Sequence, residues 1–160
     1  MIPFMFNDDN FKDTLWEEHR SDDAIVCTIT YEGKYVGYCG IKDTTKDKWE
    51  INIELLKKYF NNGIGYRSIS KLLQAIKERI GVTIFRVRIE PENEASQRLF
   101  EKLGAKPNGI SELLLHGEQM YKFEEENLNL LDDRLIELAG KFGVESRKML
   151  SCVLEYEIRW

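Results

Sequence analysis

The sequence predicts a mixed α/β (α+β) domain with a central, mostly antiparallel sheet, one parallel crossover and flanking helices. Two observations lead to this fold class. Three strand-like runs follow one another at 24–31, 35–42 and 49–55, which is the pattern of an antiparallel meander. After residue 60 the pattern changes to helix, strand and helix, which is typical of a parallel crossover. The 160 residues suffice for one domain over 1–160 without metal or disulfide staples.

The N-terminal part predicts a short helix followed by a hairpin and a third strand. Apolar residues at helical spacing favour a helix over 7–19. Glu32-Gly33-Lys34 separates the first two strand-like runs and is a hairpin signature. In 49–55 apolar and polar residues alternate strictly, as expected for a strand with two different faces.

The middle of the chain predicts two helices on either side of a strand. The turn at 61–65 opens an amphipathic pattern that runs to Ile80 and is ended by Gly81. A strand is predicted at 84–89. Asn93 is a good N-cap for a helix over 94–103, which Gly104 ends.

The C-terminal third predicts a helical insertion before a last strand, for six or seven strands in all. A strand is expected at 110–115 and another at 150–160. Between them, leucines in alternating steps of three and four residues favour one long helix at about 119–142, capped by Gly143. We expect the acidic run 124–126 to lie on the solvated start of this helix, where negative charge suits the helix dipole.

Composition and charge limit the classes of partner. The net charge of −5, from 23 basic and 28 acidic residues, argues against a nucleic-acid partner and is compatible with a cationic substrate. No apolar run approaches the roughly 18 residues of a membrane span, and no signal peptide pattern is present. We therefore expect no membrane partner and a cytoplasmic location.

The cysteines predict neither a metal site nor a disulfide. Cys27, Cys39 and Cys152 are widely spaced, and each falls in an apolar strand-like run where a thiol behaves as a small hydrophobe. The two histidines lie in unrelated segments, so no zinc pattern is present. We expect no metal in this protein.

The turn Asn61-Asn62-Gly63-Ile64-Gly65 predicts a phosphate site. Glycines at a helix start let backbone amides approach an anion, which the helix dipole also favours. A Walker loop would need Gly-Lys-Ser/Thr, but Tyr66-Arg67 follows here. A dinucleotide fingerprint would need a third glycine where the chain has Ser68. Phosphate binding therefore survives, whereas nucleotide hydrolase and dehydrogenase functions do not.

Two segments resemble a known family. Phe60-Asn61-Asn62-Gly63-Ile64-Gly65 resembles the Gln/Arg-x-x-Gly-x-Gly/Ala loop of GNAT acetyltransferases, which grips the CoA pyrophosphate. The stretch 93–105 is similar to the second signature of that superfamily. Its wording, Asn-x-x-Ser followed by Glu-Lys-Leu-Gly, looks like the subgroup of ribosomal-protein N-terminal acetyltransferases. The resemblance covers about residues 24–115.

The resemblance implies the GNAT fold, acetyl-CoA as co-substrate and an amine as acceptor. It places the end of the third strand, from Glu54, at a bulge whose backbone pairs with the pantetheine arm. The turn and the start of its helix would wrap the pyrophosphate, Asn93 would reach the arm, and two residues of the second signature would lie beside the thioester sulfur. The cofactor residues so implied are Leu55, Leu56, Asn61, Asn62, Gly63, Ile64, Gly65, Tyr66, Arg67, Asn93, Ser96 and Phe100.

The resemblance also implies catalytic residues, with alternatives left open. Glu50 matches the position of a glutamate that serves several family members as base through a water, and Glu54 shares its strand face; both could equally point at solvent. Phe100 stands where the family often has a proton-donating tyrosine. Three alternatives remain: Ser96 replaces the tyrosine, the thiolate leaves unaided, or the domain binds acetyl-CoA without transfer. Phe60 in place of Gln/Arg matters less, since the loop binds through its backbone.

The function expected is transfer of acetyl from acetyl-CoA to a primary amine of a small molecule or a peptide or protein N-terminus. The alternatives are a catalytically weak CoA-binding regulatory or interaction module, and a fold-sharing interaction protein without cofactor. The region before the first confident strand is short for the family, so a second protomer could supply the missing wall of the acceptor site, as a homodimer. Arg86 and Arg88 are expected on a solvated or helix-covered face, and Tyr156 and Trp160 in the core.

Overall fold

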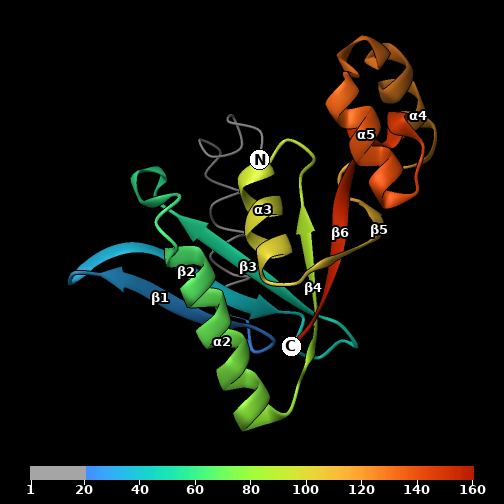
Figure 1. The fold of residues 1–160 in the computed structure, drawn as a ribbon. Coiled ribbons are helices and arrows are strands. Elements are labelled where there is room, and N and C mark those ends of the chain that lie inside the picture. Colours follow the sequence, from blue (N-terminus) through green and yellow to red (C-terminus); the bar gives the residue numbers. More distant parts are fainter. Residues whose placement is uncertain (1–20) are drawn as a thin grey trace. The chain divides into compact units, whose positions relative to one another are not determined.

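The computed structural model describes residues 21–160 (Figure 1), so the helix expected at 7–19 lies outside the described residues. Six strands form one sheet in the order β1-β2-β3-β4-β6-β5, which confirms the mixed α/β fold class. The chain divides into two compact units. We call Met1–Arg86 with Arg159–Trp160 the N-terminal unit, and Val87–Ile158 the C-terminal unit; each is described by itself.

The N-terminal unit begins with the expected meander. Strands β1 (Ile25–Tyr31), β2 (Lys34–Lys42) and β3 (Trp49–Leu55) pair antiparallel in sequence order. The β1–β2 turn has positive φ at Glu32 (50°) and Gly33 (74°), which is the backbone of a two-residue hairpin turn that matches strand twist. The hairpin and the third strand are thus confirmed.

Helix α2 (Ile64–Ile80) makes the crossover from β3 to β4 (Ile84–Ile89), and β3 and β4 pair in parallel as expected. The helix contacts β2 and β3 and ends at Gly81, whose φ of 85° is the left-handed conformation of a glycine C-cap. Its apolar stripe is buried; the stripe consists of Ile69, Leu72, Leu73 and Ile76. This burial fixes the helix start relative to β2 and β3.

The C-terminal unit contains the second half of β4, helix α3 (Glu94–Lys102), strand β5 (Lys106–Glu112) and all but the last residue of β6 (Cys152–Arg159), which pairs antiparallel with β5. Asn93 caps α3, as predicted, because its side-chain oxygen accepts a hydrogen bond from the Ser96 amide. Tyr156 is a core residue, as expected: its ring packs edge-on against Phe142, with centroids 5.0 Å apart, and its hydroxyl donates to Glu101.

The insertion between β5 and β6 differs from the single helix expected at about 119–142. It consists of α4 (Gly117–Glu126), the 3-10 turn η3 (Leu128–Leu130), α5 (Asp133–Phe142) and the 3-10 segment η4 (Ser146–Leu150). The expected single helix is interrupted at Asp132. This residue has an extended backbone, and its side chain accepts a hydrogen bond from the Leu135 amide, so that a new helix starts there. The leucine spacing did not reveal this interruption, because 3-10 turns and α-helices place apolar residues at similar intervals.

The acidic run also lies elsewhere than expected. Residues 124–126 form the last turn of α4, and the Glu124 side chain is fully buried. Its carboxylate accepts hydrogen bonds from Arg147 Nε at 2.7 Å, Lys148 Nζ at 3.1 Å and Ser151 Oγ at 2.5 Å. Glu124 therefore ties α4 to the segment that leads into β6, a contact that the sequence pattern could not predict because the cations lie 23 residues or more away.

Candidate active site

The start of α2 carries backbone donors that have no partner within the protein. Gly63 is the N-cap residue, with a φ of 72°, and no side chain caps the helix. Among residues 21–160, the amides of Asn62, Gly63, Ile64 and Gly65 have no hydrogen-bond acceptor. The first turns of most helices are satisfied by side chains or water. Here the amides converge on an open turn, which is the arrangement that binds phosphate groups at helix starts.

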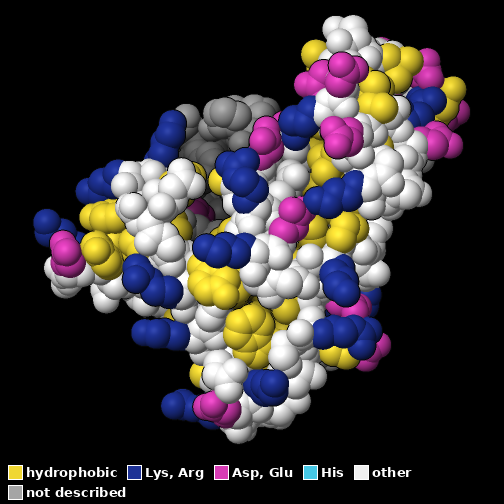
Figure 2. All heavy atoms as spheres, viewed as in Figure 1, with side chains coloured by type: hydrophobic (Ala, Val, Ile, Leu, Met, Phe, Trp, Pro, Cys, Tyr) yellow, Lys and Arg dark blue, Asp and Glu magenta, His cyan; other side chains and the backbone are white. Residues whose placement is uncertain are grey.

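Positive charge surrounds this turn in a chain that is acidic overall. Lys57 and Lys58, in the 3-10 segment η2 (Lys57–Tyr59), are exposed, as are Arg67 and Lys71 on α2, and the first turn of α2 contains no acidic residue. Arg67 Nη2 lies 3.5 Å from the Asn62 carbonyl, so its guanidinium reaches back over the turn. Several lysine and arginine side chains lie on the surface over α2 (Figure 2). The local field therefore favours an anion.

Strand β3 ends next to this turn. Within the N-terminal unit, its parallel pairing with β4 joins Trp49 to Phe85 and Glu50 to Arg86, and no strand of that unit pairs with the same side of β3 beyond Glu50. Pairing with β2 continues without a register shift to Leu55, and the Leu56 amide then donates to Val36 at 2.9 Å. The bulge expected at the end of this strand is therefore absent against β2.

Glu50 is a buried member of an ion-pair cluster. Its side chain is only 6% exposed, and its carboxylate lies 2.9 Å from Arg86 Nη2 and 3.7 Å from Lys42 Nζ. Arg86 also pairs with Asp43 at 3.3 Å. The expectation that Arg86 lies on a merely solvated or helix-covered face is therefore wrong. Burial of Glu50 requires the two cations, and they in turn hold the turn between β2 and β3 against β4.

Glu54 is exposed and shares its strand face with two polar groups that the sequence analysis did not single out. The Tyr38 hydroxyl donates to Glu54 Oε2 at 3.1 Å, because Tyr38 is the β2 residue directly opposite Glu54. Asn52 lies between Glu50 and Glu54 on the same face, and its Oδ1 is buried without a hydrogen-bond partner among the described residues. The hairpin register could have predicted Tyr38, since a two-residue turn fixes which residues oppose one another.

The remaining implied residues lie in the C-terminal unit. The Asn93 side-chain oxygen accepts from the Ser96 amide at 3.1 Å and so caps α3. Ser96 is half-buried in the first turn of α3, whereas Phe100 is only 1% exposed and belongs to the core. Of the implied residues, Glu50 to Arg67 belong to the N-terminal unit and these three belong to the C-terminal unit.

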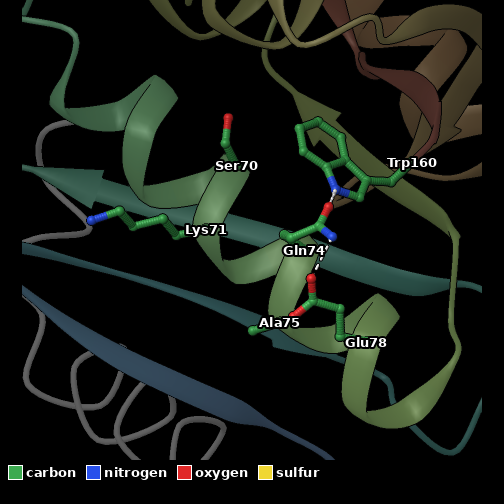
Figure 3. Close-up of a pocket in the computed structure, with 6 residues that line it drawn as sticks. All are labelled: Ser70, Lys71, Gln74, Ala75, Glu78 and Trp160. Carbon is green, nitrogen blue, oxygen red and sulfur yellow. Dashed lines mark hydrogen bonds between the residues drawn. The ribbon is translucent and has the colours of Figure 1, made fainter.

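A second concave surface lies on the exposed side of α2, away from its start (Figure 3). This hollow of about 420 Å³ is lined by Ser70, Lys71, Gln74, Ala75, Glu78 and Trp160. The Trp160 indole donates to Gln74, which in turn donates to Glu78, so polar bonds place the indole on the helix surface rather than in the core as expected. None of the implied cofactor residues lines this hollow.

Within residues 21–160, no group of three or more His, Cys, Asp or Glu side chains is placed to hold a metal ion. In the same part of the chain, no helix combines the length and apolar character that a membrane span requires.

The family follows from the match of residues 5–106 to the model of the acetyltransferase (GNAT) domain, which covers more than half of the chain and includes both the α2 turn and the start of α3. The chain belongs to the GNAT acetyltransferase family. It is accordingly an acyltransferase. No curated protein matches it in sequence.

Solved GNAT structures resemble the chain in fold. The ribosomal-protein-alanine N-acetyltransferase of Brucella melitensis aligns with a TM-score of 0.59 and 16% identity, over 96% of this chain and 79% of that one. RimJ of Mycobacterium smegmatis, solved with CoA-disulfide, aligns with a TM-score of 0.61 and 14% identity, over 94% and 59%. The yncA acetyltransferase of Salmonella typhimurium, solved with acetyl-CoA, aligns with a TM-score of 0.58 and 15% identity, over 95% and 73%. At these identities the likeness concerns the fold.

Proposed function

We propose that this GNAT protein transfers the acetyl group of acetyl-CoA to a primary amine of a small molecule or of a peptide or protein N-terminus. The observation that carries the proposal is the start of α2, which no side chain caps, beside the end of β3, which no strand of the N-terminal unit pairs on that side beyond Glu50. The family match and the CoA-bound neighbours of the same fold support it.

The residues of the N-terminal unit fit a CoA molecule. The unpaired amides from Asn62 to Gly65 are donors for a diphosphate, and the exposed Lys57, Lys58 and Arg67 add charge complementarity. Beyond Glu50, the side of β3 that no strand of the N-terminal unit pairs offers backbone groups of the kind that pair with the amides of a pantetheine arm. When bound, acetyl-CoA supplies the thioester carbonyl that an amine attacks.

Glu54 is the general base in this proposal. An amine of pKa about 8 to 10.4 must lose a proton before it attacks. Glu50 is buried and its carboxylate is occupied by Arg86 and Lys42, so it supports the strand. Glu54 is exposed, and its hydrogen bond from Tyr38 orients the carboxylate while leaving oxygen lone pairs for a proton.

Asn52 strengthens the preference for a cationic acceptor. Its buried Oδ1 is an acceptor without a partner among the described residues, and it lies between two carboxylates on one strand face. An ammonium group carries donors only, so it could satisfy Asn52 and Glu54 together. An acceptor such as an alcohol would gain less from the negative charge of this face.

Position 100 cannot supply the proton for the CoA sulfur, because it holds a buried phenylalanine and not a tyrosine. Ser96 stays the proposed donor, with unaided departure of the thiolate as the alternative, since a thiol of pKa about 8.5 is a fair leaving group. General acid help contributes about 10²–10⁴-fold, so its absence would slow transfer without abolishing it.

Thiol release from acetyl-CoA, measured with a panel of small amines and N-terminal peptides, tests the proposal. We expect release with at least one amine, together with thermal stabilisation by CoA alone. Stabilisation by CoA without release for any amine would contradict transfer and favour the regulatory module. Absence of both would favour a fold-sharing protein that binds no cofactor.

A further inference from the structure

Two cysteines face one another across the β1–β2 hairpin. Cys27 on β1 is the register partner of Cys39 on β2, between the pairs Ile25–Ile41 and Ile29–Gly37. Residues directly opposite in an antiparallel pair place their side chains on the same face of the sheet. The two thiols therefore lie side by side. The sequence did not show this, because it placed each cysteine in a separate apolar run.

The geometry of the pair suits a disulfide. Opposite residues of an antiparallel ladder have Cα atoms about 4.5 or 5.5 Å apart. Disulfides span Cα distances of about 4.4–6.8 Å, a range that includes both types of pair, and the Cβ atoms of opposite residues, about 4.5–5.5 Å apart, need only a small approach to form the bond. Burial raises the pKa of Cys39 to about 11, and the neighbouring Cys27 adds to this rise, which places the two sulfurs within electrostatic reach of each other.

The two cysteines differ in access to solvent. Cys27 is exposed, on the strand that begins the sheet order, whereas Cys39 is only 3% exposed. A small oxidant therefore reacts first with Cys27. Cys39 is then the resolving thiol, which attacks the oxidised Cys27. The third cysteine, Cys152, is buried on β6 in the C-terminal unit and has no cysteine among its β5 register partners.

We propose that Cys27 and Cys39 form a reversible cross-strand disulfide, and that this bond ties the edge strand β1 to β2 when the protein meets a low-molecular-weight disulfide such as oxidised glutathione. The role assigned to these cysteines by their sequence context, that of small hydrophobes, holds for the burial of Cys39 but not for Cys27. The proposal is independent of acetyl transfer.

The chemistry is thiol–disulfide exchange in two steps. The Cys27 thiolate attacks one sulfur of the small disulfide, forms a mixed disulfide and releases one small thiol. Cys39 then gives up its proton to solvent, its sulfur attacks the Cys27 sulfur and releases the second small thiol. In sum, two protein thiols are oxidised to one disulfide, and one small disulfide is reduced to two thiols.

The bond would act on the part of the sheet with least support. No strand flanks β1 on its outer side in the described part of the chain, and the β1–β2 register shifts between Ile29 and Thr30. The cross-link lies on the opposite side of this irregularity from the hairpin turn. It would therefore hold the half of β1 that the turn does not, and local opening of that half should become rarer.

Oxidation of the full-length protein with oxidised glutathione, followed by intact mass and peptide mapping, tests the proposal. We expect loss of two hydrogens with no added glutathione, and joint loss of alkylation at Cys27 and Cys39 while Cys152 keeps its thiol. Amide exchange of residues 25–28 should slow in the oxidised protein and recover on reduction. Cys152→Ser should behave like the wild type, whereas Cys27→Ser should form no internal bond.

Three results would overturn the proposal, and two are read on the wild-type chain, so no variant has to fold. They are a stable glutathione adduct at Cys27 with Cys39 still reduced, a disulfide between two chains through Cys27, and an internal disulfide that needs Cys152. If amide exchange of residues 25–28 did not change after oxidation, the claim that the disulfide ties β1 to β2 would be wrong, even where the bond forms.

Discussion

Helix α2 starts differently from helices α3 and α5. The starts of α3 and α5 follow the usual rule: Asn93 and Asp132 each accept a hydrogen bond from an amide of the first turn, and each first turn contains an acidic residue. At the start of α2, Gly63 offers no side chain, and no acid is present. Helix α4 also lacks a side-chain cap, but its first turn contains Glu118. Among the described α-helices, α2 is therefore the one that starts with neither a side-chain cap nor an acidic residue, which leaves its donors suited to an anionic partner.

The same contrast separates two glutamates on one strand. Glu50 is buried and paired with cations, so its charge is used within the fold. Glu54, four residues on, is exposed and accepts a hydrogen bond from the neutral Tyr38 hydroxyl. Buried, paired polar groups such as Glu50 support stability, whereas exposed ones such as Glu54 are available for chemistry. The predictions below test that distinction, from the largest expected effect to the smallest.

Glu54→Gln should lower kcat for the best amine by about 10²–10⁴-fold, because the base is lost, while CoA affinity stays unchanged. Steady-state kinetics with thiol release measures this. Glu50→Gln is the matched variant on the same face, and we expect it to lower thermal stability. If Glu50→Gln loses kcat at unchanged stability while Glu54→Gln stays active, the two roles are reversed.

Gly63→Asp should weaken CoA binding about 100-fold, because a carboxylate at the open helix start repels a diphosphate and competes for its amides. A Cβ at Gly63 meets no atom within 4 Å, and Asn and Asp tolerate its positive φ. Gly63→Asn has the same shape without the charge and should bind CoA much more tightly than Gly63→Asp. Equal affinities by titration calorimetry would contradict the phosphate assignment.

Glu124→Gln should destabilise the protein by about 1.5–3 kcal/mol at neutral pH, because it removes charged hydrogen bonds from a buried group. Burial raises the pKa of Glu124, but hydrogen bonds from Ser151, Arg147 and Lys148 outweigh burial and hold the pKa below its ordinary value of 4.5. The stabilisation is therefore present above pH 4.5 and is lost as the pH falls through the folded-state pKa.

Denaturant unfolding of wild type and Glu124→Gln between neutral and acid pH checks this. The difference between the two proteins should shrink below pH 4.5. Other carboxyl groups of lowered pKa, such as Asp43 and Glu101, are present in both proteins and cancel. A difference that grows on acidification would contradict a charged Glu124.

Asp132→Ala should lower stability by about 1 kcal/mol, which corresponds to about 2–4 °C in Tm, because the α5 cap is lost. CoA affinity should not change. This variant is the reverse of Gly63→Asp, whose effect falls on binding rather than on stability. A loss of CoA affinity in Asp132→Ala would mean that the distinction between capped and uncapped starts does not separate the two roles.

The sequence predicted most elements of the fold because their signals are local. Alternation in 49–55, the stripe ended by Gly81 and the Asn93 cap each depend on neighbours within a few residues, and all three are found as expected. The insertion was predicted less well. Its leucine spacing runs through 128–142, but the Asp132 cap divides it, and a periodicity count does not detect a break that keeps the period.

The sequence indicated the backbone part of the candidate site and less of its side-chain arrangement. Glycines in a turn before a helix announce open amides by residue type alone. The pairing of Glu54 with Tyr38, the enclosure of Glu50 by Lys42 and Arg86, and the facing of Cys27 and Cys39 depend on which residues oppose each other between strands. Strand register joins positions 8 to 36 residues apart and leaves little trace in a single segment.

By itself, then, the sequence determined the order of most elements, the GNAT resemblance and the position of the glycine turn that we propose binds phosphate. Only the tertiary structure decided which carboxylate is open, which is neutralised and which thiol meets solvent. The physical reason is that hydrophobic period and turn chemistry act along the chain, whereas burial and charge pairing are set by residues that folding brings together.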